Sequence, residues 1–456
     1  MKYDSLHPEY VSIIDKIRIC RDCYAGESLI KSKGDVYLPR LSDQSDEGFK
    51  SYLDRSVYYA FLYNTIQGRV GQIMRKSPIF VGSDEGLYVE DITIDHKSGS
   101  ELVSTVIEEL LKVGRVGLLL DYSDRPYVSI YHAEDIHNWV ESDGVLQSVL
   151  LKESLYELKD SGYVEQVIRY RLLELSGGQY KATIMDDSGS ILEEIYPSIQ
   201  GRKLSSIPFI FINSNSTSSK TNNPPLLDVA LLSLAIYRNS ADYEQILHTL
   251  AVPTPYGTGI EPDELGGDFV LGPYEFKEFL NPDAKLGMLE FTGSGIDSIR
   301  QAIEDKMLHI SAIGGSVAFS SSKQVEQAET ARLRIAAETA ALSSIVNNAE
   351  RGINYIYKQL SEWDNDSNIV VKINRDFLDN PMTPEMLKGI NESVVMNLMS
   401  KEAAFSIRQK MELYPDGWTY EKEESLLDEQ ETPDNLTTNF AGSVSLVNNS
   451  NNEITG

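Results

Sequence analysis

Residues 224–250 read PPLLDVALLSLAIYRNSADYEQILHTL, a long apolar segment that opens on two prolines and predicts a helix, because proline suits the first helical turn. A second helix is predicted over residues 296–313, where apolar side chains recur every three or four positions. Between the two, residues 251–293 are dense in proline and glycine, which predicts a compact, turn-rich module. The apolar stripe of the second helix consists of Ile296, Ile299, Ile303, Met307 and Ile310.

Two further segments follow the second helix. Residues 314–323, GGSVAFSSSK, contain a single charged residue, Lys323, and predict a flexible loop. From Gln324 to Trp363 the sequence predicts one long helix with a continuous apolar seam in its second half. The first two helices would reach ~27–37 Å at about 1.5 Å per residue, so in a ring they could line a channel wall side by side.

The part of the chain before this block predicts an α+β domain. Helices are expected over residues 8–33, 45–76 and 99–113, where start and stop signals bracket apolar periodicity. Short strands between turns predict an antiparallel or mixed sheet, over residues 116–122, 127–131, 145–152, 166–173, 179–185 and 190–196. The segment Asn213 to Asn223 is almost entirely Asn, Ser, Thr and Lys, which predicts a mobile surface loop.

After the long helix, the sequence predicts a strand over residues 369–373 and then two or more helices over residues 383–412, joined near Ser400. Residues 421–456 are acidic and then rich in Asn, Ser and Thr, so we expect a largely disordered tail. A chain of 456 residues exceeds one hydrophobic core, and two to four substructures are expected.

The charge of the chain restricts its partners. Lys and Arg number 41 against 69 Asp and Glu, a formal net charge of −28. This charge argues against nonspecific adhesion to nucleic acid, because phosphates attract basic surfaces. A protein past which DNA must slide could use an acidic surface, although solubility alone explains the same charge equally well.

The sequence gives no sign of a membrane segment. No run approaches the ~18 uninterrupted apolar residues that a spanning helix needs, and the longest candidate, Leu226 to Tyr237, is broken by Asp228 and Ser233. The first residues lack the basic start and apolar core of a secretory signal. We therefore expect the protein to stay in the cytoplasm where it is made.

Nucleotide and metal motifs are weak or missing. The phosphate-binding pattern G-x-x-x-x-G-K-[ST] does not occur, and Gly293-Ser-Gly295 before a helix is more typical of a flexible helix start than of a phosphate site. Cys20 and Cys23 have no second pair to complete a zinc site, so we expect two reduced thiols near a helix.

The tightest histidine cluster has no catalytic or metal-binding pattern. His132 and His137 flank Glu134 and Asp135, but a spacing of five does not place two imidazoles on one helical face. We interpret this segment as a polar strand-to-helix corner anchored by Trp139. No nucleophile elbow, G-x-S-x-G, is present either.

A series of short motifs runs in order across about residues 35–380. The motifs are Tyr37-Leu-Pro-Arg-Leu41, Asp46-Glu47, Tyr52-Leu53, VGQIMRKSP at 70–78, VGRVGLLLD at 113–121, AEDI at 133–136 with Trp139, IPF at 207–209, PPLLD at 224–228, YRNSADY at 237–243 and ETAR at 329–332. As an ordered series, they resemble one family of tailed-bacteriophage portal proteins, the head-to-tail connectors of viral capsids.

The resemblance implies a portal fold and a structural role without catalytic residues, cofactor or metal. The family forms a ring, typically of twelve identical subunits, around a central DNA tunnel. Mapped onto this chain, the wing covers residues 1–223, the stem helices 224–250 and 294–313, the clip 251–293, the tunnel loop 314–323, the long helix and wing return 324–380, and the helical crown 381–420.

The resemblance also implies partners. They are other copies of the chain, the major capsid protein or a scaffold, the large subunit of the terminase motor at the clip, a head–tail adaptor, and double-stranded DNA that passes without sequence specificity. Such a protein belongs to the portal vertex of the virion and to the host cytoplasm during assembly.

Two sets of residues carry the functional expectation. The stripe Ile296 to Ile310 would pack the stem, and the tunnel loop would brush DNA with Ser316, Ser320, Ser321, Ser322 and Lys323, although the same loop residues also suit a plain helix connector. The alternative function, from another class, is a cytosolic acid–base hydrolase with a carboxylate site on the α+β domain.

Overall fold

Helix α6 (Gly99–Lys112) and strand β2 (Arg115–Tyr122) form the centre of the main core. Ser98 and Glu101 start the helix through a reciprocal capping box. Gly114, at a φ of 81°, then turns the chain directly into β2. The first six residues of β2 are all buried, as expected of a strand that is covered on both faces.

The computed structural model describes residues 1–82, 86–159, 162–199, 201–251, 254–259, 281–289, 295–315, 328–363, 368–377, 384–411, 413–414 and 418–429. The chain divides into two compact units, Met1–Phe377 and Leu378–Gly456. Its helices and antiparallel sheets confirm the predicted α+β class.

The predicted N-terminal helices exist, but two of them are broken. Gly26, with a φ of 92°, divides the first into α1 and α2. Ser56, in extended backbone, ends the first part of the second. The helices before the sheets are α1 (Pro8–Ala25), α2 (Glu27–Ser32), the 3₁₀ turn Gly34–Val36, α3 (Asp46–Arg55), α4 (Phe61–Ile73), α5 (Leu87–Glu90) and α6.

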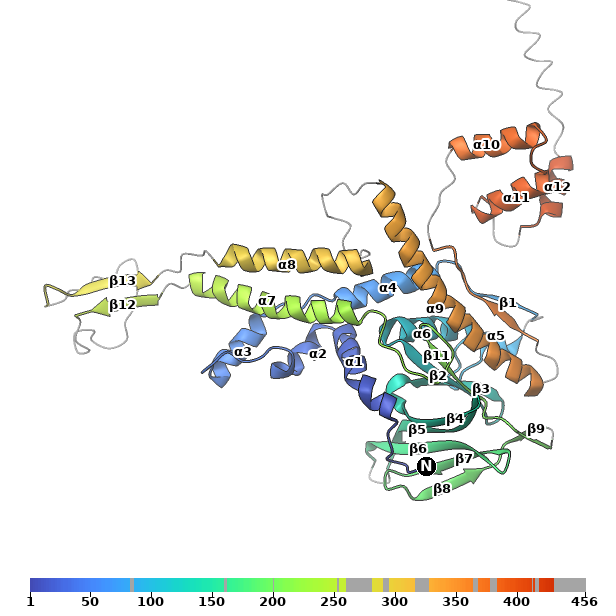
Figure 1. Cartoon of the computed structure of the whole chain (residues 1–456), viewed down its shortest axis with the longest axis horizontal. Helices are drawn as coiled ribbons and strands as arrows, with labels where there is room; N and C mark the ends of the chain where they lie inside the picture. The colour runs from blue at the N-terminus through green and yellow to red at the C-terminus, as the bar shows by residue number, and fades with distance from the viewer. Residues whose placement is uncertain are drawn as a thin grey trace, which may run out of the picture. The chain divides into compact units, whose positions relative to one another are not determined.

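Two sheets lie below the helices in Figure 1. One has three strands in the order β11-β2-β3, and the other is a five-stranded meander in the order β4 to β8. Their bounds are β3 (Pro126–His132), β4 (Ile136–Ser142), β5 (Val145–Leu158), β6 (Val164–Ser176), β7 (Gln179–Met185), β8 (Ile191–Ile195) and β11 (Phe209–Asn213). Short two-stranded pairs join β1 (Ile79–Val81) to β14 (Val370–Lys372) and β9 (Ser198–Ile199) to β10 (Arg202–Lys203).

The sheet differs from the sequence prediction in two places. The segment after His132 forms a 3₁₀ turn, Ala133–Asp135, and then strand β4, so the predicted strand-to-helix corner is wrong. Trp139 lies in that strand, buried against the ring of His7 at 3.9 Å between centroids. Strands β5 and β6 are also several residues longer than their apolar runs, because their outer halves form a ribbon with little burial.

The prediction of a mobile loop from Asn213 on is wrong. The polar groups that suggested mobility form hydrogen bonds that hold the segment in place. Its backbone and side chains are held by hydrogen bonds, among them Asn213 Nδ2 to Ser218 O at 2.7 Å and Thr221 N to Glu9 Oε2 at 2.7 Å. The buried Arg115 guanidinium donates to Ser219 O at 2.9 Å and stacks on Trp139. Burial lowers the pKa of Arg115 to about 9.

Helix α9 (Ala328–Trp363) closes the core over the three-stranded sheet. The predicted seam is confirmed, since its members are buried: Leu342, Ile345, Val346, Ala349, Ile353, Ile356 and Leu360. Gly352 allows the closest approach of helix and sheet, because a Cβ at this position would lie 2.3 Å from Ile212 Cδ1 on β11.

In the described part of the unit from Leu378 on, the helices are α10 (Pro384–Val395), α11 (Lys401–Lys410) and α12 (Tyr420–Glu429). Ser400 caps α11, as the predicted junction there requires. Helix α12 corrects the prediction of disorder from residue 421. The rings of Phe405 and Tyr420 meet edge to face, and Trp418 Nε1 donates to Glu423 at 2.9 Å, so apolar and polar contacts hold its first turn. The tail beyond Glu429 lies outside the described residues.

Substitution of Gly352 by alanine is expected to lower the melting temperature, because the added methyl group must displace the buried Ile212 side chain. The cost of such overpacking is about 1–3 kcal/mol. Gly71 on α4 is the matched control, since a Cβ there meets nothing within 4 Å. Gly71→Ala should leave stability unchanged or raise it by up to about 1 kcal/mol. Thermal melts in which Gly352→Ala is as stable as Gly71→Ala would contradict this packing.

Candidate functional site

Helix α7 (Leu227–Ala251) is anchored in the core at its N-terminal end. Val229, Leu234 and Tyr237 are buried, and α1, α3 and α4 all contact the helix. Towards its C-terminal end, residues 242–249 are exposed or half-buried. The helix therefore begins as a core element and continues as a partly exposed rod.

Helix α3 fixes the middle of α7 through polar contacts. Tyr52 OH donates to Asp242 Oδ1 at 2.6 Å, and Arg55 Nη2 donates to Gln245 Oε1 at 2.5 Å. Ser240 Oγ donates to the carbonyl of Val57 at 2.6 Å. The sequence analysis did not find these pairs, because residues about 190 positions apart leave no periodic signal.

Helix α8 (Ile296–Ile310) lies beside α7 (Figure 1). All five residues of the predicted stripe lie on its less exposed side: Ile310 is fully buried, Ile303 and Met307 pack against the main core, and Ile296 and Ile299 are half-buried. The helix ends three residues earlier than predicted, and a π turn, Ser311–Gly315, follows it.

The outer face of α8 is charged. Arg300 makes an ion pair with Glu304 at 2.8 Å and another with Asp297 at 3.3 Å. Gln301 donates to Asp305 at 2.8 Å. The two faces of α8 therefore differ, one apolar against α7 and one hydrophilic and exposed.

A hairpin of β12 (Thr254–Thr258) and β13 (Lys285–Leu289) is inserted between α7 and α8. Tyr256 faces Gly287 across the pair, and its ring lies 2.8 Å from where a Cβ would stand. Leu286 and Met288 are 42% and 44% exposed, so this small sheet has no core of its own. Residues 260–280 of the predicted turn-rich module lie outside the described residues.

The predicted tunnel-loop residues Ser316, Ser320, Ser321, Ser322 and Lys323 lie outside the described residues, which end at Gly315 and resume at Ala328. Of the two predicted sets of residues, only the α8 stripe can therefore be placed.

His132, one of the two clustered histidines, belongs to an ionic network around the buried carboxylate of Glu109. Arg21 on α1 binds Glu109 through both terminal nitrogens, at 2.7 and 2.5 Å, and Glu134 through Nε at 2.5 Å. His132 Nδ1 lies 3.0 Å from Glu109, and Lys112 Nζ lies 3.2 Å from it. His137 takes no part in this network. The network joins α1, α6 and the turn after β3, so it holds the helical layer to the sheet.

This network shifts the pKa values of its members. Burial alone would raise the pKa of Glu109, but hydrogen bonds from His132 and Arg21 outweigh it and hold the pKa well below the ordinary value. The hydrogen bond to Glu109 in turn raises the pKa of His132. These shifts have a structural cause, in that each charge is paired with its opposite.

A cavity of about 620 Å³ opens between the two sheets and is the place where an acid–base site would be sought. One carboxylate lines it, that of Asp121, and Arg171 Nη2 lies 2.5 Å from its Oδ2. Tyr127 OH donates to the same oxygen at 3.2 Å. An arrangement in which a guanidinium neutralises the single carboxylate favours a structural ion pair over hydrolytic chemistry.

The two cysteines are free thiols on α1, as predicted. Burial raises the pKa of each to about 12, so neither is a reactive thiolate. Within the described ranges, no cluster of three His, Cys, Asp or Glu side chains could hold a metal ion. None of the helices in the described part of the chain combines the length and apolar character that a bilayer crossing requires.

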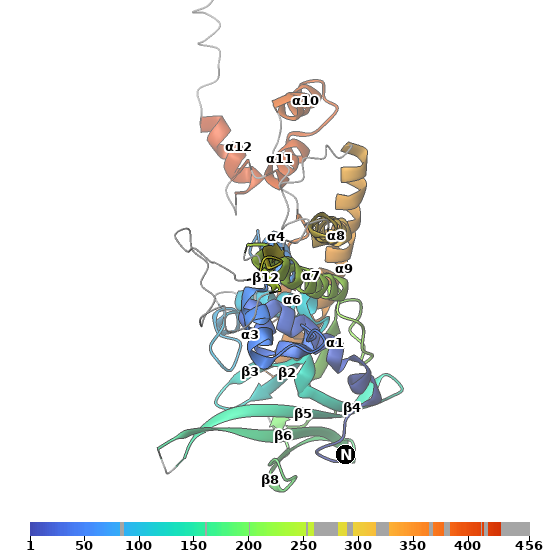
Figure 2. The same cartoon turned by 90° about the vertical axis from the view of Figure 1, so that its left-hand side faces the viewer.

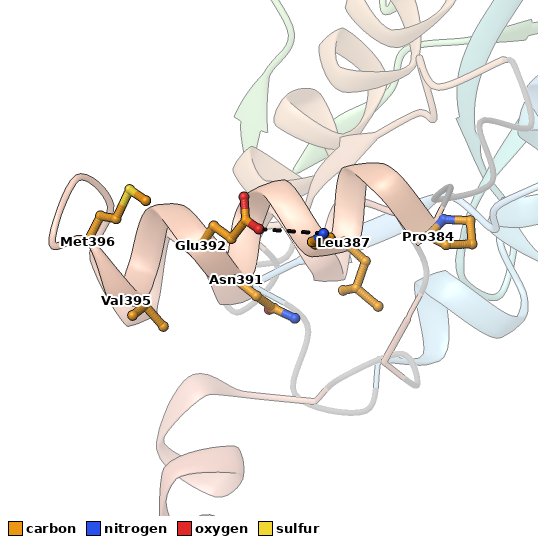
Figure 3. A pocket seen from close by; sticks show the side chains of 7 residues that line it. Pro384, Leu387, Asn391, Glu392, Val395 and Met396 are labelled. Carbon is orange, nitrogen blue, oxygen red and sulfur yellow. Dashed lines mark ion pairs between the residues drawn. The ribbon is translucent and has the colours of Figure 1, made fainter.

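In the unit from Leu378 on, Figure 3 shows a groove along one side of α10. Leu387, Val395 and Met396 line it, and an ion pair between Lys388 and Glu392 at 3.9 Å crosses the helix surface. No residue of α10 is buried. The groove offers apolar contact and lacks the converging polar groups of a small-molecule site.

A family model described as a domain of unknown function, DUF4055, matches residues 225–364, which run from the start of α7 to the end of α9. No curated protein matches the chain. Among solved structures, the chain is similar to a chain of the virion of a native gene transfer agent particle, at 12% identity and a TM-score of 0.40, with 85% of this chain and 99% of that chain covered.

The chain is also similar to a chain in the neck of an empty gene transfer agent particle, at 12% identity and a TM-score of 0.38, with 77% and 89% covered. A third similar structure is an HK97-family phage portal protein from Corynebacterium diphtheriae, at 8% identity and a TM-score of 0.32, with 73% and 95% covered.

The ionic network predicts a pH-dependent effect of His132→Asn. Because the folded-state pKa of His132 is raised, its contribution to stability is fully present below the unfolded value of about 6.5 and is lost as the pH rises through the folded value. Denaturant unfolding should therefore show a larger loss of free energy at about pH 5.5 than at about pH 8.5.

Glu109→Gln serves as the partner variant in a double-mutant cycle. It removes the anion that Arg21, Lys112 and His132 share, and should cost about 3–5 kcal/mol at neutral pH. In its background, the pH dependence of His132→Asn should vanish. An equal loss from His132→Asn at both pH values in the wild-type background would contradict the assignment.

Proposed function

We propose that this chain is a portal subunit, which assembles with copies of itself into a ring at one vertex of a viral capsid and conducts double-stranded DNA. The observation that carries the proposal is the order α7, inserted hairpin, α8, turn and long α9, in which α8 contacts α7 and has its predicted stripe on its less exposed side. The ordered sequence motifs and the portal family's sequence of stem, clip, stem, loop and long helix support it.

The anchoring of α7 supports a stem. Its first half is held by the core and its second half continues beside α8 as a two-helix rod (Figure 1). A subunit in a ring needs surfaces of this kind that present different faces to its two neighbours, because heterologous contacts close a ring only when the rotation is fixed.

The charge supports a conduit more than a DNA-binding surface. A net charge of −28 repels phosphates, and on the described stem helix α8 the basic Arg300 is already paired with Asp297 and Glu304. DNA in contact with this surface would release few of its counterions. It would therefore slide past without strong binding.

The finer assignments follow the same proposal. Residues 1–223 would be the wing, 251–293 the clip that docks the terminase large subunit, 314–323 the tunnel loop and 381–420 the crown. The major capsid protein or scaffold and a head–tail adaptor would complete the partners, and the protein would reside at the portal vertex of the virion.

Ring formation is expected to depend on the stripe of α8. Ile303→Asp should prevent rings in negative-stain images of the purified protein, because it places an unpaired carboxylate against the apolar side of α7. Ser298→Asp is the matched control, since Ser298 is exposed on the same helix and should tolerate the charge. Rings at normal yield with Ile303→Asp would exclude the stem assignment, and a melting curve of each variant separates lost assembly from lost folding.

The tunnel loop gives a test on DNA itself. Deletion of Ser316 to Ser322 should leave rings intact and lower the amount of DNA packaged or retained. Arginines in place of Ser320, Ser321 and Ser322 should slow translocation in a salt-dependent manner, since each basic contact releases counterions. Unchanged packaging with both variants would reduce the segment to a helix connector.

A further inference from the structure

Strands β5 and β6 extend beyond the sheet as a two-stranded arm, seen in Figure 2 as the long ribbon that passes the neighbouring strands. Strand β4 pairs with β5 only up to Leu151, and β7 pairs with β6 only from Tyr170 on. Residues 153–158 and 164–169 therefore pair with each other and with no third strand in the described part of the chain. We call these two segments the arm.

One face of the arm is uncharged and apolar. The cross-strand pairs Tyr156–Gln166 and Leu158–Val164 share this face, because directly opposed residues point to the same side of a sheet. Tyr156 is 76% exposed, Leu158 74% and Val164 64%. Three large apolar side chains therefore lie side by side in water.

The opposite face of the arm carries the charges. The Glu157 carboxylate forms one ion pair with Arg169 and another with Lys159, the latter at 3.2 Å. The ribbon is therefore amphipathic, with a charged side, which also carries Glu165 opposite Glu157, and an uncovered uncharged side. An isolated two-stranded ribbon of this kind is marginally stable in water, and its open edges and apolar face favour contact with a partner.

The position of the arm points to a second copy of this chain as the partner. The fourteen residues of β5 span about 46 Å at 3.3 Å per residue, with the arm at one end. At the other end lie two more exposed apolar residues, Val140 and Val145, each 49% exposed. Val140 belongs to the edge strand β4, which the N-terminal segment contacts only earlier along the strand, where His7 N donates to His137 O at 2.9 Å. Unlike patches at opposite ends of one strand are what a head-to-tail contact between identical subunits needs.

Charge and area are consistent with this partner. Two copies that each carry a net charge of −28 repel one another, and an uncharged face lets them touch without like charges in contact. A ribbon face about 20 Å long and ~10 Å wide covers roughly 200 Å², well below the ~800 Å² per partner of a stable interface. The arm alone could not hold a dimer, but it could add one contact at every junction of a ring.

We propose that the arm of each subunit packs its Tyr156, Leu158 and Val164 face against the β4 edge of the next copy, near Val140. The inference rests on the proposed ring and names the wing contact within it.

The first test is the concentration at which rings assemble. Tyr156→Ser with Leu158→Ser should raise the half-assembly concentration by about tenfold or more, since two buried apolar contacts are lost at each junction. Leu155→Ser is the matched control, because Leu155 lies on the same strand but on the charged face. A double variant that assembles at the wild-type concentration overturns the arm contact and leaves the portal proposal standing. Wild-type protein that forms no rings overturns the portal proposal itself.

The second test locates the acceptor. A Tyr156→Cys and Val140→Cys double variant, treated with a short thiol cross-linker, should give a ladder of covalent multimers, while either single variant should not. The native Cys20 and Cys23 are buried in the folded protein and should not react with the cross-linker under non-denaturing conditions. Rings without a ladder overturn the contact at β4, as does cross-linking of the Tyr156→Cys arm to a capsid protein instead of to another copy.

Discussion

The structure depends on the burial of one end of α7. In the N-terminal half of the helix, Tyr237 is fully buried, and its hydroxyl lies 3.1 Å from Ser56 Oγ. A helix held so firmly at one end can continue beside α8 with modest burial, because its direction is set by the core and not by the exposed part. The rod formed by α7 and α8 is in this sense an extension of the hydrophobic core.

The helices and sheets that precede α7 in the chain are held together by an ionic network. The network around Glu109 ties the helices to the sheets, and its buried charges are compensated within a single cluster. The arm of β5 and β6 differs from this network, because its apolar face has no partner within the described part of the chain and stays exposed to solvent. An exposed apolar face of this kind is typical of a surface that a partner covers.

Much of the fold could be predicted from the sequence, because long apolar periods survive tertiary context. The stripe of α8 and the seam of α9 were predicted residue by residue and are on the buried sides of their helices. Helix breaks were harder, since Gly26 acts through a single backbone angle that periodicity does not register. The arm could not be predicted, because its strands are held by pairing with each other and carry no burial pattern.

Polar composition predicted mobility or disorder less reliably than apolar periodicity predicted helices. The segment after Asn213 and the residues of α12 were expected to be mobile or disordered, yet hydrogen bonds from Asn213 and Trp418 organise both. Polar side chains can replace a core when each one finds a backbone or side-chain partner. Contacts at the candidate site could not be predicted either. The hydrogen bond of Tyr52 with Asp242, for example, joins positions that only the folded chain brings together.

Negative-stain microscopy of the purified wild-type chain tests the central claim most directly. The account predicts closed rings with a central hole, built from copies of a 51.0 kDa subunit. A monodisperse monomer that turns over a hydrolysable substrate would contradict it.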